Sequence, residues 1–305
     1  MRYRFVTADV FTDRVFGGNP LAVLPDAAGI GDDDMQKVAR EFNLSETVFV
    51  LPAEDARNTR RLRIFTPARE LPFAGHPTVG TALVLGWLGE IDLRGDATEI
   101  VFEEGAGPVP VTIRASGGRA ESAELVAPRP PELRKGPGAT ELAALLSLDP
   151  SELRYDAGLP EACSCGLPFL IIEVRDAAAL GRARLDRTVW QRLLADAWAK
   201  EVYLFTRDAS AAGADFRARA FAPAAGIEED PATGSAAAAL GGWLGTREAT
   251  DDGSRRYVIA QGIEMGRPSR LEVEVERRGG ALAAVRVGGG AVTVAEGTIE
   301  VPGAG

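Results

Sequence analysis

RIFTPA at residues 63–68 and GWLG at residues 86–89 are the stretches of this sequence that decide its fold, because each of them occurs a second time. The first returns as RAFAPA at residues 219–224, and the second returns as GWLG at residues 242–245. Both pairs are 156 residues apart. A repeat with so long a period predicts two duplicated domains. The space between duplicated domains is a common place for a small-molecule site.

Each GWLG closes a run of residues that is apolar on nearly every side. These runs cover residues 77–88 in the first half and residues 234–244 in the second half. Because a helix that is hydrophobic all round is buried, we expect one central buried helix in each half. Predicted strands outnumber predicted helices in both halves, which indicates an α+β fold.

Bulk composition excludes several classes of protein. A length of 305 residues suggests about two domains, and 46% hydrophobic with 26% charged residues is ordinary for a soluble protein. The net charge of −10 argues against a nucleic-acid or anionic-membrane surface, since both need clustered Lys and Arg. No apolar run approaches the roughly 20 residues of a membrane helix, and the N-terminal sequence lacks the pattern of a signal peptide. We therefore expect a cytoplasmic protein without nucleic-acid or membrane partners.

A Pro-rich segment at residues 127–138 is the predicted linker between the two halves. The first domain is then expected at residues 1–126 and the second at residues 139–284. Predicted strands within residues 285–305 leave open a return of the chain to the first domain, because duplicated domains often exchange terminal strands.

The two loops that lead into the central helices contain the most unusual residues. The first loop is FAGHPTVG at residues 73–80, and the second is EEDPATGSA at residues 228–236. Shifting the repeat by two residues aligns His76 with Asp230. Each loop then places one titratable side chain just before a proline that suits the first helical turn.

We expect these two helix starts to form a paired site for an anion such as a carboxylate. The expected donors are backbone N–H groups at residues 75–76 and 233–235, next to the positive end of each helix dipole. Cys163 and Cys165 lie too close together to supply a zinc cluster or to approach a substrate from opposite faces. The sequence also lacks the glycine-rich motifs of dinucleotide and P-loop nucleotide sites. We therefore expect neither a metal nor a cofactor.

His76 and Asp230 each have a second interpretation. His76 is the only histidine, and an isolated histidine at a helix start is more often bonded to solvent or to a backbone carbonyl. Its position opposite Asp230 favours a site role instead. Asp230 also has the pattern of a plain helix cap. We expect its neighbours Glu228 and Glu229 to be no more than a cap and a solvated charge.

Glu46 lies between a predicted helix and a predicted strand, in the NLSET sequence at residues 43–47. One interpretation is an exposed strand start. The other is a partly buried carboxylate whose pKa is raised toward the working range of a general base. Glu201 occupies the matching place in the second half, and it shows that a glutamate also fits there for structural reasons.

These residues give the chain a resemblance to the phenazine-biosynthesis PhzF-like family, within the diaminopimelate-epimerase-like superfamily. The matching stretches run in order over almost the whole chain and show no departure at any motif position. They are DVFT at 9–12, GNPLAV at 18–23, NLSET at 43–47, RIFTP at 63–67, GHPT at 75–78, GIEEDPATGSA at 226–236, QG at 261–262 and GRPS at 266–269.

The resemblance implies two similar domains, each a curved and mostly antiparallel sheet rolled around one helix, with the active site in the cleft between the domains. It also implies a cofactor-free isomerase that is often a homodimer. In the best-understood branch of the family the substrate is trans-2,3-dihydro-3-hydroxyanthranilate. The family label alone does not fix the substrate of a given member.

The resemblance also implies roles for single residues. The glutamate of the Ser-Glu-Thr motif, here Glu46, moves the proton, and His76 and Asp230 assist at the site. The residues expected to bind the substrate are Asn19, Gly75, Thr233, Gly234 and Ser235. Because neither loop contains a cysteine, racemisation by paired thiols is disfavoured.

Three classes of function follow from these observations. The leading one is an isomerase in which Glu46 removes a proton from a small carboxylated substrate and returns it at another carbon. The second is an epimerase or racemase that acts with two groups on opposite faces, such as Glu46 and Asp230. The third is a metabolite-binding protein without turnover. A lactone or amide hydrolase is less favoured, because Ser235 has no adjacent base in its motif.

Overall fold

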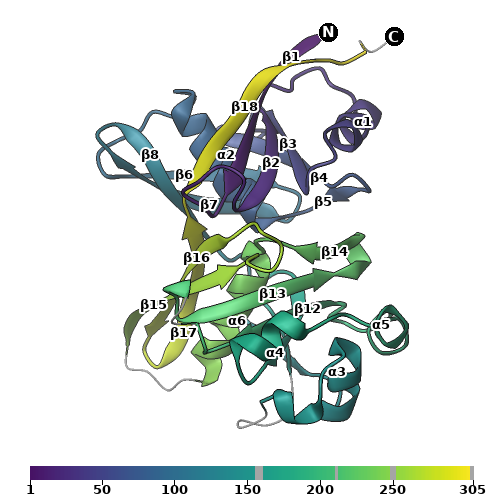
Figure 1. Ribbon diagram of the computed structural model, residues 1–305. Helices are drawn as coiled ribbons and strands as arrows, with labels where there is room; N and C mark the ends of the chain where they lie inside the picture. Colours follow the sequence, from purple (N-terminus) through teal and green to yellow (C-terminus); the bar gives the residue numbers. More distant parts are fainter. Residues whose placement is uncertain (155–160, 210–211, 248–251, 303–305) are drawn as a thin grey trace. The chain divides into compact units, whose positions relative to one another are not determined.

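A computed structural model of the protein describes residues 1–154, 161–209, 212–247 and 252–302 (Figure 1). The fold is α+β, as predicted, with many strands and few helices. The chain forms two compact units, one of Met1–Val126 with Gly288–Gly305 and one of Ala127–Val287. None of the helices in the described ranges is both long enough and apolar enough to cross a membrane.

The first unit is a mostly antiparallel arrangement of strands with two helices. Parallel pairing occurs between β2 and β3 and between β4 and β6. Its elements are β1 (Arg2–Val10), β2 (Asn19–Leu24), α1 (Asp32–Phe42), β3 (Glu46–Leu51), β4 (Arg60–Phe65), β5 (Glu70–Leu71), α2 (Gly75–Trp87), β6 (Ala97–Glu104), β7 (Gly107–Ser116), β8 (Arg119–Val126) and β18 (Ala291–Glu300).

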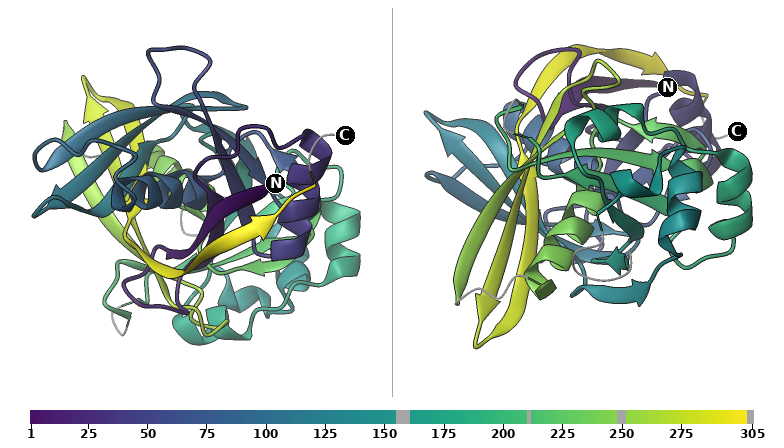
Figure 2. Two further views of the ribbon diagram at one scale, coloured as in Figure 1. Left: turned by 90° about the horizontal axis from the view of Figure 1, so that it is seen from above. Right: turned by 60° about the horizontal axis from the view of Figure 1, so that its bottom comes forward.

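The end of the chain lies in this first unit. β18 pairs antiparallel with β1 along its whole length, from Arg2 opposite Glu300 to Val10 opposite Ala291. The two strands run side by side in both views of Figure 2, where β1 is purple and β18 is yellow.

The buried helix that the sequence predicts over residues 77–88 is confirmed as α2. All of its residues from Gly75 to Leu85 are buried, and it packs against β1, β2 and β8. The packing is close, because a Cβ atom on Gly80 would lie 2.6 Å from side-chain atoms of Val10 and Leu21. A glycine at this position therefore lets the helix lie directly on the strands.

The second unit adds several short helices to its strands. Its elements are β9 (Glu132–Lys135), α3 (Ala139–Leu146), η1 (Pro150–Glu152), β10 (Glu161–Ser164), β11 (Pro168–Glu173), α4 (Ala177–Arg182), α5 (Arg187–Leu193), β12 (Glu201–Thr206), β13 (Phe216–Ala222), η3 (Pro223–Ala225), β14 (Ile227–Asp230), α6 (Gly234–Arg247), β15 (Gly253–Gln261), β16 (Ser269–Arg278) and β17 (Ala281–Gly289).

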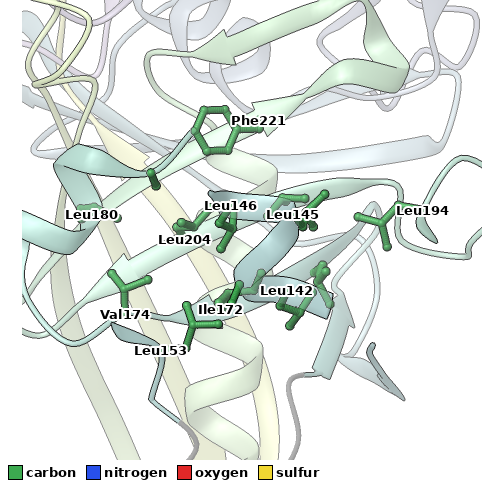
Figure 3. Close-up of a cluster of buried hydrophobic side chains, with 14 of the residues drawn as sticks. Leu142, Leu145, Leu146, Leu153, Ile172, Val174, Leu180, Leu194, Leu204 and Phe221 are labelled. Atoms are coloured by element: carbon green, nitrogen blue, oxygen red, sulfur yellow. The ribbon is translucent and has the colours of Figure 1, made fainter. Parts of the chain in front are cut away.

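The second predicted buried helix, residues 234–244, is confirmed as α6 and extends to Arg247. It packs on β16, where a Cβ atom on Gly241 would lie 2.5 Å from the Val273 side chain. A separate apolar cluster joins the short helices to β11, β12 and β13 (Figure 3). Leu142, Leu146 and Leu204 are fully buried members of that cluster.

One sequence prediction about the second unit is wrong in detail. The expected linker at residues 127–138 contains β9, whose backbone groups pair antiparallel with β10, so that Leu133 lies opposite Cys163. The helix α5 in this unit is short and ends at Leu193. The chain turns there because Ala197 donates its backbone N–H to the Leu194 carbonyl, and this turn buries Leu194.

Candidate functional site

Glu46 and His76 lie next to each other in the first unit. Glu46 is the first residue of β3 and pairs in parallel register with Leu21 of β2, while His76 is in the first turn of α2. The carboxylate Oε2 and the imidazole Nε2 are 3.0 Å apart. The two residues are only 7% and 4% exposed. The fold therefore brings together two of the predicted site residues that are 30 positions apart in the sequence.

This contact lacks the angles of a hydrogen bond. Within the described ranges, neither Glu46 Oε2 nor His76 Nε2 has a hydrogen-bond partner, although both atoms are buried. Burying such groups without a hydrogen bond is unfavourable, and native proteins keep few of them. Within the described ranges the two atoms are therefore close to each other and have no other hydrogen bond, so both remain open to a bound molecule.

Asn19 lies on β2, the strand that pairs with β3, and Gly75 lies on α2, the helix that carries His76. Asn19 is the first residue of β2, is fully buried and lies opposite Val10 of β1. Gly75 is the first residue of α2. The loop between β1 and β2 is held by the buried Asp9, whose carboxylate accepts a 2.6 Å hydrogen bond from the Phe16 N–H. No role for Asp9 follows from the sequence alone.

Asp230 lies in the second unit, at the end of β14. Its carboxylate Oδ2 accepts a 2.5 Å hydrogen bond from the Thr233 hydroxyl. The side-chain amide of Gln261 donates to the Asp230 backbone carbonyl at 2.8 Å and to the Thr233 hydroxyl at 3.0 Å. Gly234 and Ser235 follow as the first two residues of α6. The segment that contains Asp230 is therefore fixed by a network of short polar contacts.

Gln261 is the centre of this network. Its carbonyl Oε1 accepts hydrogen bonds from the Thr233 N–H at 3.2 Å and from the Tyr203 hydroxyl at 3.1 Å. Burial, with a smaller effect of the nearby Asp230 charge, raises the pKa of Tyr203, so this hydroxyl keeps its proton and remains a donor. Gln261 belongs to a motif of the family resemblance, yet nothing in the sequence indicated its partners.

Two expectations for the second loop are wrong. Pro231 is not in the first helical turn, because α6 begins only at Gly234. The N–H of Thr233 is not available to an anion, because Gln261 accepts its hydrogen bond. In the first loop, by contrast, Pro77 lies inside the first turn of α2.

Glu229 is also not a solvated charge. The Arg219 guanidinium donates two hydrogen bonds to its carboxylate, both at 2.8 Å. Arg219 itself is buried and also donates to the carbonyls of Leu180 and Ala183. The residue before Asp230 is thereby anchored to β13. The repeat contained a signal for this contact, since an arginine opens both of its copies.

The remaining titratable groups in the part of the chain that the structure describes can be compared with the ligand sets of metal sites. Within the described ranges, no group of three or more His, Cys, Asp or Glu side chains could hold a metal ion. Cys163 and Cys165 are buried free thiols. Contact with Cys165, together with burial, raises the pKa of Cys163, so this thiol stays neutral and unreactive.

Comparison with known proteins places these residues in a wider context. Residues 8–297 match a family model described as phenazine biosynthesis-like protein. An uncharacterised isomerase of Mesorhizobium japonicum is 42% identical over 300 residues, which are 97% of this chain and 98% of that protein. The trans-2,3-dihydro-3-hydroxyanthranilate isomerase of Pseudomonas aeruginosa is 36% identical over 296 residues, which are 97% of this chain and 98% of that protein.

A solved structure shows the same fold. The phenazine biosynthesis protein of the PhzF family from Bacillus anthracis aligns with a TM-score of 0.88 at 26% sequence identity. The alignment covers 98% of this chain and 99% of the Bacillus anthracis chain.

Proposed function

We propose that this isomerase, which belongs to the phenazine biosynthesis-like protein family, moves a proton between two carbons of a small carboxylated substrate without a cofactor. The observation that supports the proposal most is the 3.0 Å contact between the buried Glu46 carboxylate and His76. Removing a proton from carbon needs a base that is positioned and partly screened from water. Glu46 meets this requirement, because it is buried and its Oε2 has no hydrogen-bond partner within the described ranges.

We assign the base to Glu46 rather than to His76. His76 lies in the first turn of α2, where the positive end of the helix dipole disfavours an imidazolium. A neutral imidazole at this place can donate a hydrogen bond to the substrate or return the proton at the second carbon. Asn19 and Gly75 are the proposed substrate-binding residues beside this pair.

We further propose that Asp230, Gly234 and Ser235 bind the substrate, while Thr233 holds the Asp230 carboxylate in place through its hydroxyl. Backbone N–H groups at the start of a helix as long as α6 suit a carboxylate. The Asp230 carboxylate suits an amino or hydroxyl group of the substrate. The support for joint action of the two sets of residues is the family resemblance and the repeat in the sequence. The same resemblance supports a homodimer.

Duplication of the two units is part of this proposal. Arg63 on β4 and Arg219 on β13 occupy the same place in the repeated stretch. Each guanidinium forms two hydrogen bonds to a glutamate on the short strand that follows, Glu70 on β5 and Glu229 on β14. Such a matched pair of contacts is what a duplicated ancestor would leave.

The substrate of the Pseudomonas aeruginosa relative is the first compound to test. The protein is incubated in deuterated water with trans-2,3-dihydro-3-hydroxyanthranilate and with a panel of small amino and hydroxy acids, and C–H signals are followed by NMR. Deuterium incorporation together with a shifted double bond is the expected result. Inversion at one carbon would instead indicate an epimerase. Binding without any exchange across the panel would contradict the proposal.

A further inference from the structure

A buried carboxyl group that the proposed mechanism does not use lies beside the helix turn that carries His76. Glu104 is the last residue of β6, and its side chain is buried. Its Oε1 lies 2.6 Å from the hydroxyl oxygen of Thr78. The same hydroxyl oxygen lies 2.7 Å from the backbone carbonyl oxygen of Ala74, the N-cap residue of α2.

A hydroxyl group has a single proton, which decides the state of Glu104. The Ala74 carbonyl can only accept, so the Thr78 hydroxyl must donate to it to make the 2.7 Å contact favourable. The hydroxyl then has only lone pairs left for Glu104. A 2.6 Å contact with an ionised carboxylate would place two acceptors against each other, whereas a protonated carboxyl can donate to the Thr78 oxygen. A proton on Glu104 is the arrangement that makes both contacts of the Thr78 hydroxyl favourable at once.

The turn after Glu104 contacts the chain at Pro72, just before α2 begins. β6 and β7 form a hairpin in which Glu104 pairs with Gly107. Within this turn, Ala106 donates its N–H to the Pro72 carbonyl at 2.7 Å. A Cβ atom on Gly105 would lie 2.9 Å from the Pro72 Cα. The hairpin thus holds the chain at Pro72, four residues before His76, and at Thr78, two residues after His76.

The second unit has an amide at the corresponding place. Gln261 is the last residue of β15, as Glu104 is of β6, and each of these strands pairs in parallel with the arginine-bearing strand of its own unit. Gln261 bonds to Asp230 and Thr233 ahead of α6, as Glu104 bonds to Thr78 in the first turn of α2. A glutamine is always neutral and always a donor. Its presence at this place indicates that the fold needs a neutral donor there.

We propose that Glu104 is a positioning residue for His76, which acts as a neutral carboxylic acid and holds the first turn of α2 against the β6–β7 hairpin by donating to Thr78. The inference deepens the proposed function, on which it rests for the role of His76 in proton transfer. Burial raises the pKa of Glu104 to about 8, and the contact with Thr78 is a smaller influence that lowers this pKa. Ionisation above this pH forces Thr78 to donate to Glu104 and to release the Ala74 carbonyl.

Other titratable groups near Glu104 are engaged elsewhere. The Glu103 side chain points to the opposite face of β6 and accepts hydrogen bonds from the N–H groups of Glu54 and Asp55. Arg61, which lies opposite Glu103 on β4, forms an ion pair with Glu54. His76 is the titratable group on α2 near Glu104.

The test uses the fact that His76 is the only histidine of the chain. The Cε1–H resonance of the intact protein, labelled with 13C-histidine, is followed by NMR from pH 5 to pH 10. We expect the wild-type signal to show an inflection near pH 8 that reports Glu104. Glu104→Gln should abolish that inflection and leave the chemical shift at pH 6 unchanged, because the amide can still donate to Thr78. Glu103→Gln, the matched control, should keep the inflection.

Two further measurements make the outcome decisive. Thr78→Val removes the hydroxyl that connects Glu104 to α2, so it should also abolish the inflection, and it serves if Glu104→Gln fails to fold. The infrared difference spectrum of wild type minus Glu104→Gln at pH 7 should show the carbonyl stretch of a protonated carboxylic acid. An inflection that persists in Glu104→Gln, or a carboxylate band in place of the acid band, would overturn the proposal. These readouts need no substrate, so they are independent of the proposed reaction.

Discussion

The two segments that lead into α2 and α6 begin alike and end differently. Arg63 lies over the ring of Phe65 at 5.2 Å and binds Glu70, while Arg219 lies over the ring of Phe221 at 4.9 Å and binds Glu229. After these matching contacts the chains diverge. α2 begins early and includes His76 in its first turn, whereas β14 continues to Asp230 and α6 begins only at Gly234.

Because of this difference, the segments that lead into α2 and α6 present two different kinds of polar group. In the first unit, the helix start brings a histidine to 3.0 Å from Glu46, and neither of those two atoms has a hydrogen-bond partner in the described part of the chain. In the second unit, the strand end places an aspartate in a network with Thr233 and Gln261. A pair without committed partners suits proton transfer, while a fixed acceptor suits binding. Under the proposed function, we therefore expect Glu46 and His76 of the first unit to supply the chemistry.

The largest expected effect separates Glu46 from its counterpart Glu201. Each of them is the first residue of a strand that pairs in parallel with the strand before it, β3 with β2 and β12 with β11. Glu46→Gln keeps the shape and removes the basicity, so it should lower the rate of deuterium incorporation by about 10²–10⁴-fold. Ligand binding should remain, because the amide occupies the same volume. The rates are compared by NMR at saturating substrate.

Glu201→Gln is the matched control and should leave the rate of exchange nearly unchanged. Equal losses in the two variants would mean that the two units do not divide the chemistry as proposed. Full exchange in Glu46→Gln together with no exchange in His76→Asn would move the base to the histidine.

The next effect concerns how stability depends on pH, and it contrasts Glu104 with Gln261. Burial raises the pKa of Glu104 from 4.5 to about 8, so between these values the folded chain holds a proton that the unfolded chain has released. The stabilising contribution of that proton is complete below pH 4.5 and is lost as the pH rises to about 8. The loss has an upper bound of about 5 kcal/mol. The Glu104→Gln variant has no titratable group at this position, so it should not lose stability as the pH rises.

Urea unfolding of wild type and Glu104→Gln at pH 5, 6.5 and 8 measures this effect. The two midpoints should nearly coincide at pH 5, and the variant should be increasingly more stable as the pH rises. Gln261→Glu should do the opposite and introduce a loss of stability with rising pH in the second unit. Parallel curves for wild type and Glu104→Gln would show that Glu104 does not take up a proton on folding.

The parts of this structure that the sequence predicted are those that depend on local pattern. Runs that are apolar on every side predicted both buried helices, and the excess of predicted strands over helices predicted the α+β class. The sequence also named Glu46 and His76 as candidates. It could not show their contact, because that contact depends on where α2 begins and on the register of β3 against β2.

The polar residues that hold the two helix starts were missed for a physical reason. Glu104, Gln261 and Arg219 are single polar residues within or at the end of strand sequences, and nothing local distinguishes a buried polar partner from an exposed one. The position of Pro231 relative to α6 was also mispredicted. Pro231 suits a first helical turn, but Asp230 still pairs with Ala220 across β13 and β14, and this pairing delays the helix.

A third comparison tests whether α2 and α6 are equally central to their units. Leu83 and Leu240 are both fully buried. Truncating either one to alanine should destabilise the protein by about 2–5 kcal/mol, because it removes apolar contacts and leaves a cavity. Val294→Ala on β18, a partly exposed position, should change stability by no more than about 0.5 kcal/mol. Urea unfolding provides the values, and a cost at Leu83 no larger than that at Val294 would show that α2 is not part of the core.

The smallest expected difference concerns the two arginine–glutamate pairs. The side chains of Arg219 and Glu229 are 4% and 15% exposed, whereas the side chain of Glu70 is 42% exposed and its partner Arg63 also contacts Asp32. Glu229→Gln leaves a buried guanidinium without its counter-charge, which should lower the free energy of unfolding by about 3 kcal/mol. Glu70→Gln leaves Arg63 with a second acid, so the loss should stay below about 1 kcal/mol.

Urea unfolding in low and high salt tests this contrast between the pairs. Salt screens exposed charges much more than buried ones, so it should remove the small effect of Glu70→Gln and leave most of the effect of Glu229→Gln.

Glu229 is next to Asp230 in the sequence, so its contact with Arg219 should also affect substrate binding. Losing the Arg219 contact frees the end of β14, so Glu229→Gln should weaken substrate binding while the exchange rate at saturating substrate stays close to wild type. If the two variants lose equal stability, or if Glu229→Gln slows exchange without weakening binding, the Arg219 pair does not position Asp230 as inferred.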